Sequence, residues 1–202
     1  MDRIIIGLVG SLSSGKGTLA NHLKDLGFSY QILSDRVREE AVLRGLTISR
    51  STLQDVGNDL RETFGGQILA ERTAKLITAN TSHLAIDSIR HPDEIIYLKN
   101  NFAIHILGID ADRQLRLHRY LGRAKDRGED GTTIADFERD DRRDFGLGEP
   151  TLGQQVGLCL QMAETILPNN GSKEDLFKFC DQYLKEALHF DPEIYHRHKE
   201  KL

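Results

Sequence analysis

A short glycine-rich stretch near the start of the chain carries the clearest chemical signal. It reads Gly10-Ser-Leu-Ser-Ser-Gly15-Lys16-Gly17-Thr18. This fits the phosphate-loop pattern G-x-x-x-x-G-K-[ST], except that Gly17 separates the lysine from the threonine. Glycines let backbone N–H groups turn toward one anion, the lysine adds a point charge, and a following helix adds its positive N-terminal end. The stretch therefore predicts a phosphate site.

The flanking residues supply the context that this motif needs. An apolar run over 4–9 precedes the loop, and an amphipathic pattern through Leu19, Ala20, Leu23 and Leu26 follows it. Strand, loop and helix in that order are the setting in which the pattern is specific. Because Gly17 follows the lysine, the hydroxyl for a magnesium ion is expected from Thr18, unless the backbone of Gly17 replaces a side-chain contact.

An acid stands at the end of a second buried strand. Leu84, Ala85 and Ile86 form a short apolar run, and Asp87 ends it, with Arg90 three residues further on. An acid at a strand end can hold magnesium directly or through water. The same residue could instead cap the turn or helix that follows the strand.

A run of basic residues follows the fourth expected strand, which spans 102–109. Arg116, Arg119, Arg123 and Arg127 are spaced by three and four, so they share a helical face. Most charged helix faces are simply solvated. No acid, however, lies between Gln114 and Lys125, and a stripe of one sign favours an anionic ligand opposite it.

Two further features could complete a site for group transfer. Asp35, after the second strand, could orient or deprotonate an acceptor hydroxyl, and Arg38 could pair with an acceptor phosphate; alternatively, Asp35 is a helix N-cap and Arg38 is exposed. Residues 120–145 contain a Gly128–Gly131 turn and a second short helix. Such an excursion suits a closing lid or a static surface hairpin.

The remaining pattern predicts one α/β domain over residues 1–202. Strand, helix and strand in the first part of the chain form a βαβ unit with parallel strands. Residues 36–66 read as an inserted helical flap, because three helices exceed the needs of one crossover. Helix starts are expected at possible capping boxes in 51–54, 151–154 and 172–175.

The amino-acid composition limits the kinds of binding partner that we expect. The 202 residues carry a net charge of −4, which gives no electrostatic reason to expect nucleic acid or an anionic membrane. The two cysteines have no metal-type spacing, so no zinc site is expected. The first apolar run is too short for a signal peptide, and no long apolar span follows. A cytoplasmic protein, monomeric or a small homo-oligomer, is expected.

Together these residues resemble the nucleoside monophosphate kinase group of P-loop proteins over nearly the whole chain. The loop with G-K-G-T is similar to that of adenylate kinase, and 34–40 is similar to the acceptor-side strand end and helix of the group. Residues 86–94 look like its Asp-x-x-Arg segment, and 154–172 resembles the stretch ending in the adenine-side loop. Adenylate-kinase-related proteins, dephospho-coenzyme A kinase and deoxynucleotide monophosphate kinases are the most similar members.

The resemblance implies a three-layer fold with a five-stranded parallel sheet of order 2-3-1-4-5, an acceptor flap at 36–66 and a lid near 120–145. It implies ATP and Mg²⁺ as cofactors, with metal ligands at Thr18 and Asp87. The implied ATP contacts are Gly10, Ser13, Ser14, Gly15, Lys16, Gly17, Thr18, Leu19 and Asn170. The implied catalytic residues are Lys16, Asp35, Arg90, Arg119, Arg123 and Arg127, and the acceptor is expected at Asp35, Arg38 and Arg90.

The expected activity is transfer of a phosphoryl group from ATP to a small metabolite, a nucleoside or deoxynucleoside monophosphate. Two alternatives stay open. One is phosphorylation of a ribose hydroxyl, as in dephospho-coenzyme A kinase, although that kinase has an Asp-x-Asp where this chain has only Asp35. The other is a regulator that binds ATP without transferring phosphate. Adenylate kinase also has a proline inside the loop, where this chain has Ser13 and Ser14.

Overall fold

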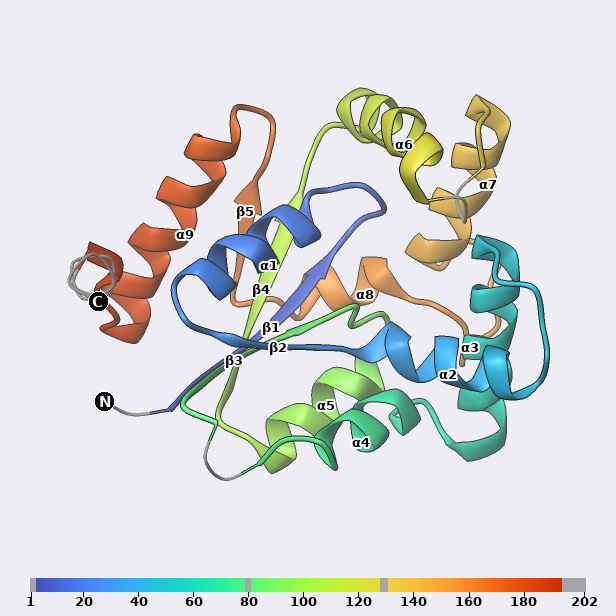
Figure 1. Ribbon diagram of the computed structural model, residues 1–202, viewed down its shortest axis with the longest axis horizontal. Helices are drawn as coiled ribbons and strands as arrows, with labels where there is room; N and C mark the ends of the chain where they lie inside the picture. The colour runs from blue at the N-terminus through green and yellow to red at the C-terminus, as the bar shows by residue number, and fades with distance from the viewer. Residues whose placement is uncertain (1–2, 79–80, 128–130, 194–202) are drawn as a thin grey trace.

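The computed structural model describes residues 3–78, 81–127 and 131–193. At its centre lies a five-stranded parallel sheet in the order β2-β3-β1-β4-β5 (Figure 1). The strands are β1 (Ile4–Gly10), β2 (Ser29–Ile32), β3 (His83–Asp87), β4 (Ile104–Asp110) and β5 (Thr165–Pro168). The predicted parallel sheet and its strand order are confirmed.

Helices cover both faces of this sheet and make three layers. They are α1 (Lys16–Asp25), α2 (Leu33–Leu43), α3 (Arg50–Phe64), α4 (Ile68–Ala74), α5 (Pro92–Asn101), α6 (Arg113–Arg127), α7 (Ile134–Phe145), α8 (Val156–Gln161) and α9 (Lys173–Leu188). One core joins α1 and α9 to the sheet, and another joins α2, α3, α4, α5 and α8 to its opposite face.

The pleat of β1 explains why this strand is central. Ile6 and Leu8 belong to the core under α1 and α9, whereas Ile5 and Val9 belong to the opposite core. Successive side chains of a strand point to opposite faces, so a strand between two helical layers must be apolar at every position. The near-continuous apolar run before the glycine-rich loop has this property.

The register of the sheet gathers the strand ends on which the site depends. Gly10 of β1 pairs with Ile109 of β4, and Asp110 pairs with Pro168 of β5. On the other side Asp87 of β3 pairs with Ile32 of β2. Ligands of open α/β sheets bind at this carboxyl edge, so the loop after β1 and the acid after β3 lie at one edge.

Helices α6 and α7 pack against each other beside the phosphate loop (Figure 1). The rings of Tyr120 and Phe137 are in edge contact at 5.5 Å between centroids, and both pack with Leu12 of the loop. The Tyr120 hydroxyl donates to Asp140 over 2.7 Å. The predicted lid segment 120–145 lies on these helices, and the turn at 128–130 lies outside the described residues.

Two of the three predicted helix starts are wrong. The N-cap of α3 is Ser49, whose side chain accepts from the backbone N–H of Thr52, and α8 begins after Gln155 without a side-chain cap. The expected box in 172–175 is present, because Ser172 and Asp175 cap α9 reciprocally. The glutamines that end the two wrong boxes, Gln54 and Gln154, instead hydrogen-bond to each other.

Candidate functional site

The glycine-rich loop folds over its own lysine. It runs from the end of β1 to Lys16, the first residue of α1, with left-handed backbone at Ser13 (φ 61°) and Gly15 (φ 109°). The Lys16 ammonium donates to the carbonyl oxygens of Gly10, over 2.5 Å, and Ser11, over 3.1 Å. These contacts hold the positive charge inside the curve of the loop.

The segment after β5 contacts the glycine-rich loop through Asn169. Asn169 donates from Nδ2 to the Ser14 carbonyl over 2.7 Å, and its own N–H donates to the Asp110 carbonyl over 2.8 Å. A Cβ on Gly15 would lie 2.1 Å from Asn169 Nδ2. Gly15 is therefore required twice, by its backbone angle and by the close approach of Asn169.

We expect Gly15→Ala to destabilise the protein by about 1–3 kcal/mol, since it combines an unfavourable φ with a steric overlap. The measurement is urea unfolding without nucleotide. Gly17→Ala is the matched control for stability, because a Cβ at Gly17 meets nothing within 4 Å. Equal stabilities of the two variants would show that Asn169 does not constrain the loop.

Asp87 lies across the carboxyl edge from the loop and is held at both oxygens. The Tyr30 hydroxyl donates to Oδ2 over 2.6 Å, and the N–H of Ser88 donates to Oδ1 over 2.5 Å. Ser88 has a left-handed backbone (φ 64°) that turns the chain away from the strand. These bonds fix the carboxylate in one orientation while each oxygen keeps a lone pair for a further partner.

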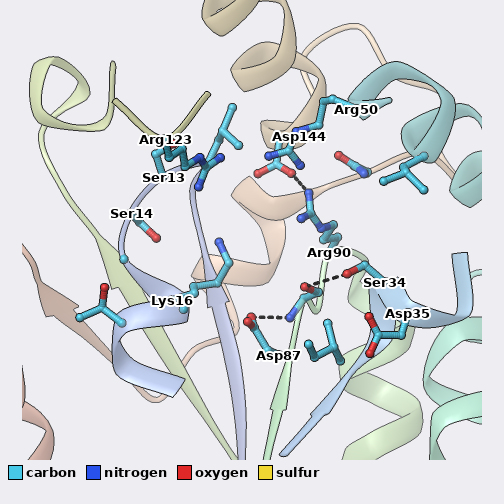
Figure 2. A pocket seen from close by; sticks show the side chains of 18 of the residues that line it. Ser13, Ser14, Lys16, Ser34, Asp35, Arg50, Asp87, Arg90, Arg123 and Asp144 are labelled. Carbon is cyan, nitrogen blue, oxygen red and sulfur yellow. Dashed lines mark hydrogen bonds and ion pairs between the residues drawn. The ribbon is translucent and has the colours of Figure 1, made fainter. Parts of the chain in front are cut away.

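The arginines that follow β3 and β4 divide into two groups. Arg90, Arg119 and Arg123 line the same cavity as Lys16. Figure 2 shows Lys16, Arg90 and Arg123. Arg119 donates from Nη2 to the Asn169 carbonyl over 2.9 Å, and its buried Nη1 has no hydrogen-bond partner among the described residues. By contrast, Arg116 binds Asp141 and the Leu12 carbonyl. The helical face predicted from spacing is therefore shared between the cavity and the packing of α6.

The cavity has a volume of about 780 Å³ and runs from the phosphate loop to α2 and α3. Among the predicted site residues, its lining contains Ser13, Ser14, Gly15, Lys16, Gly17, Thr18, Asp35, Arg38, Asp87, Arg90, Arg119 and Arg123. Asp35 lies inside the first turn of α2, whose N-cap is Ile32, so it is not the N-cap that the sequence left as an alternative.

Four of the predicted residues are not placed in this lining. Gly10 packs against β4, where a Cβ would lie 2.2 Å from the Ile109 carbonyl oxygen. Leu19 is fully buried in the core, and its N–H donates to the Gly15 carbonyl. Asn170 exchanges hydrogen bonds with Asp112. The side chain of Arg127 lies outside the described residues.

Several lining residues were not among the predicted site residues. They are Tyr30, Arg50, Gln54, Arg61, Asp144 and Gln154. Asp144, only 2% exposed, pairs with Arg90 (Figure 2). Tyr30, Gln54, Gln154, Arg61 and Asp144 have partners far away in sequence, so a local pattern could not identify them. In the sequence, the feature that could have indicated Asp144 is that it is an acid within a stretch rich in arginine.

The surroundings of Lys16 shift the pKa of its ammonium group. Burial lowers the pKa of its ammonium from 10.5 to about 8, with Arg90 and Arg123 acting in the same direction. Asp144 and Asp87 oppose this shift and favour the charged form. A lysine whose charge is destabilised by burial is strongly attracted to an anion that enters the same space.

In the part of the chain that the structure describes, no cluster of three His, Cys, Asp or Glu side chains could hold a metal ion. A magnesium ion held by one or two side chains and by substrate phosphates needs no such cluster. None of the described helices has the length and apolar character to cross a membrane.

Solved structures with the same architecture define the class of fold. Shikimate kinase from Acinetobacter baumannii, in complex with shikimate, superposes with a TM-score of 0.56 at 18% identity, over 92% of this chain and 93% of that one. Shikimate kinase from Aquifex aeolicus gives a TM-score of 0.54 at 15% identity, over 92% and 98%. The chain has the P-loop kinase fold.

Sequence comparison gives the family. The chain is 30% identical over 174 residues to the UPF0200 protein of Hyperthermus butylicus, covering 86% of this chain and 89% of that protein. It is 29% identical over 178 residues to the UPF0200 protein of Aeropyrum pernix, covering 87% and 89%. No protein-family model matches. The chain belongs to the UPF0200 family.

Proposed function

We propose that this protein transfers a phosphoryl group from ATP, with Mg²⁺, to a small phosphorylated metabolite, a nucleoside or deoxynucleoside monophosphate. One observation carries the proposal. The phosphate loop with Lys16, the acid Asp87 and the cations Arg90, Arg119 and Arg123 all line one cavity at the carboxyl edge of the sheet. Phosphoryl transfer needs a phosphate cradle, a metal ligand and positive charge around the transferred group.

The donor side of the cavity fits a nucleotide triphosphate. Within the part of the chain that the structure describes, the buried hydroxyls of Ser13 and Ser14 have no hydrogen-bond partners, and the same is true of Nη1 of Arg119. Buried polar groups of this kind cost stability unless a ligand or water satisfies them. Lys16 and the loop N–H groups would hold the outer phosphates, and Arg119 would reach the donor from the side of Asn169.

The donor set also fits magnesium. Thr18 offers a hydroxyl from the first turn of α1, and Asp87 offers a fixed carboxylate from the end of β3; both line the cavity. Oxygen ligands of this kind are those that Mg²⁺ prefers, with phosphate oxygens completing its shell. When bound, ATP with its metal supplies the phosphoryl group and leaves as ADP.

The chain's own residues would orient the acceptor and stabilise the transferred charge. Asp35 and Arg38 of α2 line the same cavity as Arg90, and these three residues would hold the acceptor. Arg90 and Arg123 would neutralise the phosphoryl oxygens, while the α6–α7 pair would act as a lid that excludes water. Asp144 forms an ion pair with Arg90. This pair would have to break before Arg90 could bind an incoming phosphate.

The test is ADP release at fixed ATP and Mg²⁺ with a panel of acceptors. A kinase of this kind releases ADP only when one nucleoside monophosphate is present. Release that depends on a ribose hydroxyl, as in dephospho-coenzyme A, would replace the proposed acceptor. ATP binding with no acceptor-dependent release would make the protein a nucleotide-binding regulator, and a failure of ATP to raise the melting temperature would remove the proposal altogether.

Nucleotide affinity should weaken above about pH 8, where free Lys16 loses its proton. Bound phosphates favour the charged form, so the pKa of Lys16 is higher in the complex than in the free protein. Between these two pKa values binding takes up a proton, and affinity falls by at most about tenfold for each pH unit. Below the free pKa, this group adds no pH dependence.

Calorimetric titration with ATP from about pH 7 to about pH 10 measures this effect. Lys16→Arg is the control, since a guanidinium stays charged over the whole range. If the wild-type affinity, like that of the control, did not change with pH, Lys16 would not contact the bound phosphates.

For the lid, we expect Arg123→Ala to lower kcat by about 10²-fold or more, because it removes charge beside the transferred group. Its contact with the Tyr120 ring, at 5.7 Å, contributes about 1–2 kcal/mol. Arg113→Ala is the matched control, since Arg113 lies exposed on the same helix and pairs with Glu138. Steady-state kinetics that are equal for both variants would assign Arg123 a packing role only.

A further inference from the structure

An acidic side chain of helix α7 lies among the cations of the cavity. Asp144 lines the cavity together with Lys16, Arg90 and Arg123, and it forms an ion pair with Nη1 of Arg90 (Figure 2). Cations of this kind are the groups that bind phosphate most strongly in proteins. A carboxylate among them therefore takes up positive charge that a phosphate ligand would also use.

The place of Asp144 within its own helix is unfavourable. Helix α7 ends at Phe145, and its last turn contains Asp144 beside the basic residues Arg142 and Arg143. The carboxyl end of a helix carries partial negative charge, which stabilises cations and destabilises acids. An acid in this turn depends on partners outside the helix, and Arg90, from the segment after β3, is such a partner.

Two other acids of α7 have partners that serve the packing of the helix. Asp141 binds Arg116, and both residues lie outside the described lining of the cavity. Asp140 accepts a hydrogen bond from the hydroxyl of Tyr120. Asp144 differs from them, because its partner lines the cavity. The contact of Asp144 therefore belongs to the phosphate site as well as to the packing of α7.

Two acids act on Lys16, and they are held in different ways. Asp144 and Asp87 both favour the charged form of the Lys16 ammonium and raise its pKa, Asp144 more than Asp87. Two neutral donors, a hydroxyl and a backbone N–H, hold the carboxylate of Asp87. A cation, Arg90, holds that of Asp144. Since phosphate competes for cations, the contact of Asp144 is the one that phosphate would break.

We propose that Asp144 is an internal counter-anion of the phosphate site, which competes with phosphate for Arg90 and Lys16 in the free protein. This inference rests on the proposed function and adds a regulatory contact to the same site. An incoming phosphate must break the Arg90–Asp144 pair and approach a carboxylate of like charge, and both steps cost free energy. A lone phosphate is therefore bound weakly, whereas ATP gains further contacts along the loop.

Asp144→Asn tests the proposal with opposite signs in stability and binding. The amide keeps the size of the carboxylate and removes its charge. Without phosphate the melting temperature should fall, because Arg90 loses its counter-charge. The Kd for inorganic phosphate should nevertheless fall about tenfold, because a repelling charge has been removed. The measurement is the melting temperature over a series of phosphate concentrations, from which the Kd follows.

Asp141→Asn is the matched control, since it makes the same substitution on the same helix and breaks an ion pair with Arg116 outside the described cavity lining. It should lower the melting temperature and leave the Kd for phosphate within about twofold of wild type, because a distant charge is screened. Addition of Arg90→Gln to Asp144→Asn should remove most of the gain in affinity, since Arg90 is the cation that the first substitution releases.

A second measurement uses wild type and covers the case in which Asp144→Asn does not fold. Side-chain NMR of the arginines reports the guanidinium of Arg90, whose signal is assigned by its loss in Arg90→Lys. Inorganic phosphate should shift this signal, because Arg90 exchanges one anionic partner for another. An Arg90 signal that stays unchanged while the backbone signals of the phosphate loop respond to saturation would show that the pair with Asp144 stays intact, and would overturn the proposal.

Equal or weaker phosphate binding by Asp144→Asn, or an equal gain in Asp141→Asn, would also overturn it. A higher Mg²⁺ requirement for ATP binding without tighter phosphate binding would make Asp144 a metal ligand instead. None of these measurements needs turnover. If an acceptor is phosphorylated and Asp144→Asn shows no gain, the counter-anion fails alone. If Asp144→Asn shows the gain and wild type phosphorylates no acceptor, the proposed function fails alone.

Discussion

Lys16→Met should lower kcat/KM by about 10³-fold or more while the fold survives, which is the largest effect that we expect in this chain. The Lys16 ammonium donates to the carbonyl oxygens of Gly10 and Ser11 in the loop, where the outer phosphates would be held. A methionine keeps most of the volume and the apolar stem but removes the charge. Since burial disfavours that charge in the free protein, its removal should not destabilise the fold.

Coupled measurement of ADP release gives the activity, and thermal unfolding without nucleotide gives the stability. Lys185→Met is a matched control, because Lys185 is exposed on α9. The control should retain wild-type kinetics. Wild-type kinetics in Lys16→Met would remove the phosphate loop from the mechanism, whereas an unfolded Lys16→Met would show that Lys16 is needed for the structure.

Asp87→Asn should have the second largest effect, a loss of about 10²–10³-fold in magnesium-dependent turnover. An amide retains the size of the carboxylate but loses the negative charge that a divalent cation needs. Titration of activity with Mg²⁺ should show a higher half-saturating concentration as well as a lower maximum. Activity that responds to Mg²⁺ as in wild type would leave Asp87 with a structural role alone.

Tyr30→Phe separates the charge of Asp87 from its positioning. This variant removes the 2.6 Å hydrogen bond to Oδ2 and keeps the carboxylate, so a loss of only a few-fold is expected. A second readout is independent of turnover. Asp87 raises the pKa of Lys16, so Asp87→Asn should move the onset of weaker ATP binding below pH 8, whereas Tyr30→Phe should not.

The features that could be predicted from the sequence are those with local causes. The apolar run over 4–9, the glycines of the loop and the helix after it are contiguous, so the strand–loop–helix unit follows from neighbouring residues. The strand order then follows from resemblance, and the register places Asp87 and Gly10 at one edge. Lys16, Asp87 and Arg90 could be predicted to lie at this edge, and all three line the cavity.

The places of Gln54, Arg61 and Gln154 in the cavity lining could not be predicted, because the same residue types serve two purposes. Gln54 and Gln154 occur three residues after a serine or threonine, and that spacing also indicates a capping box. Their actual partners are each other, 100 residues apart. Arg61 likewise depends on Glu94, which is 33 residues away. Only the packing of α3 against the segments around α5 and α8 turns these side chains toward the cavity.

The basic residues of α6 show, within a single helix, that spacing alone does not predict the partner of each side chain. Spacing places Arg116, Arg119 and Arg123 on one face, but it cannot tell which of them meets an acid from α7. Arg116 meets Asp141 and is used in packing, whereas Arg119 and Arg123 line the cavity. Asp144, from the same acidic helix, reaches further and pairs with Arg90.

Transfer of the labelled γ-phosphate of ATP to an acceptor tests the central claim most directly. Wild type, incubated with ATP, Mg²⁺ and each nucleoside monophosphate in turn, should move the label to one of them, and Lys16→Met should not. Transfer of the label to no acceptor in the panel, with equal release of phosphate by wild type and Lys16→Met, would contradict the assignment of this cavity to phosphoryl transfer.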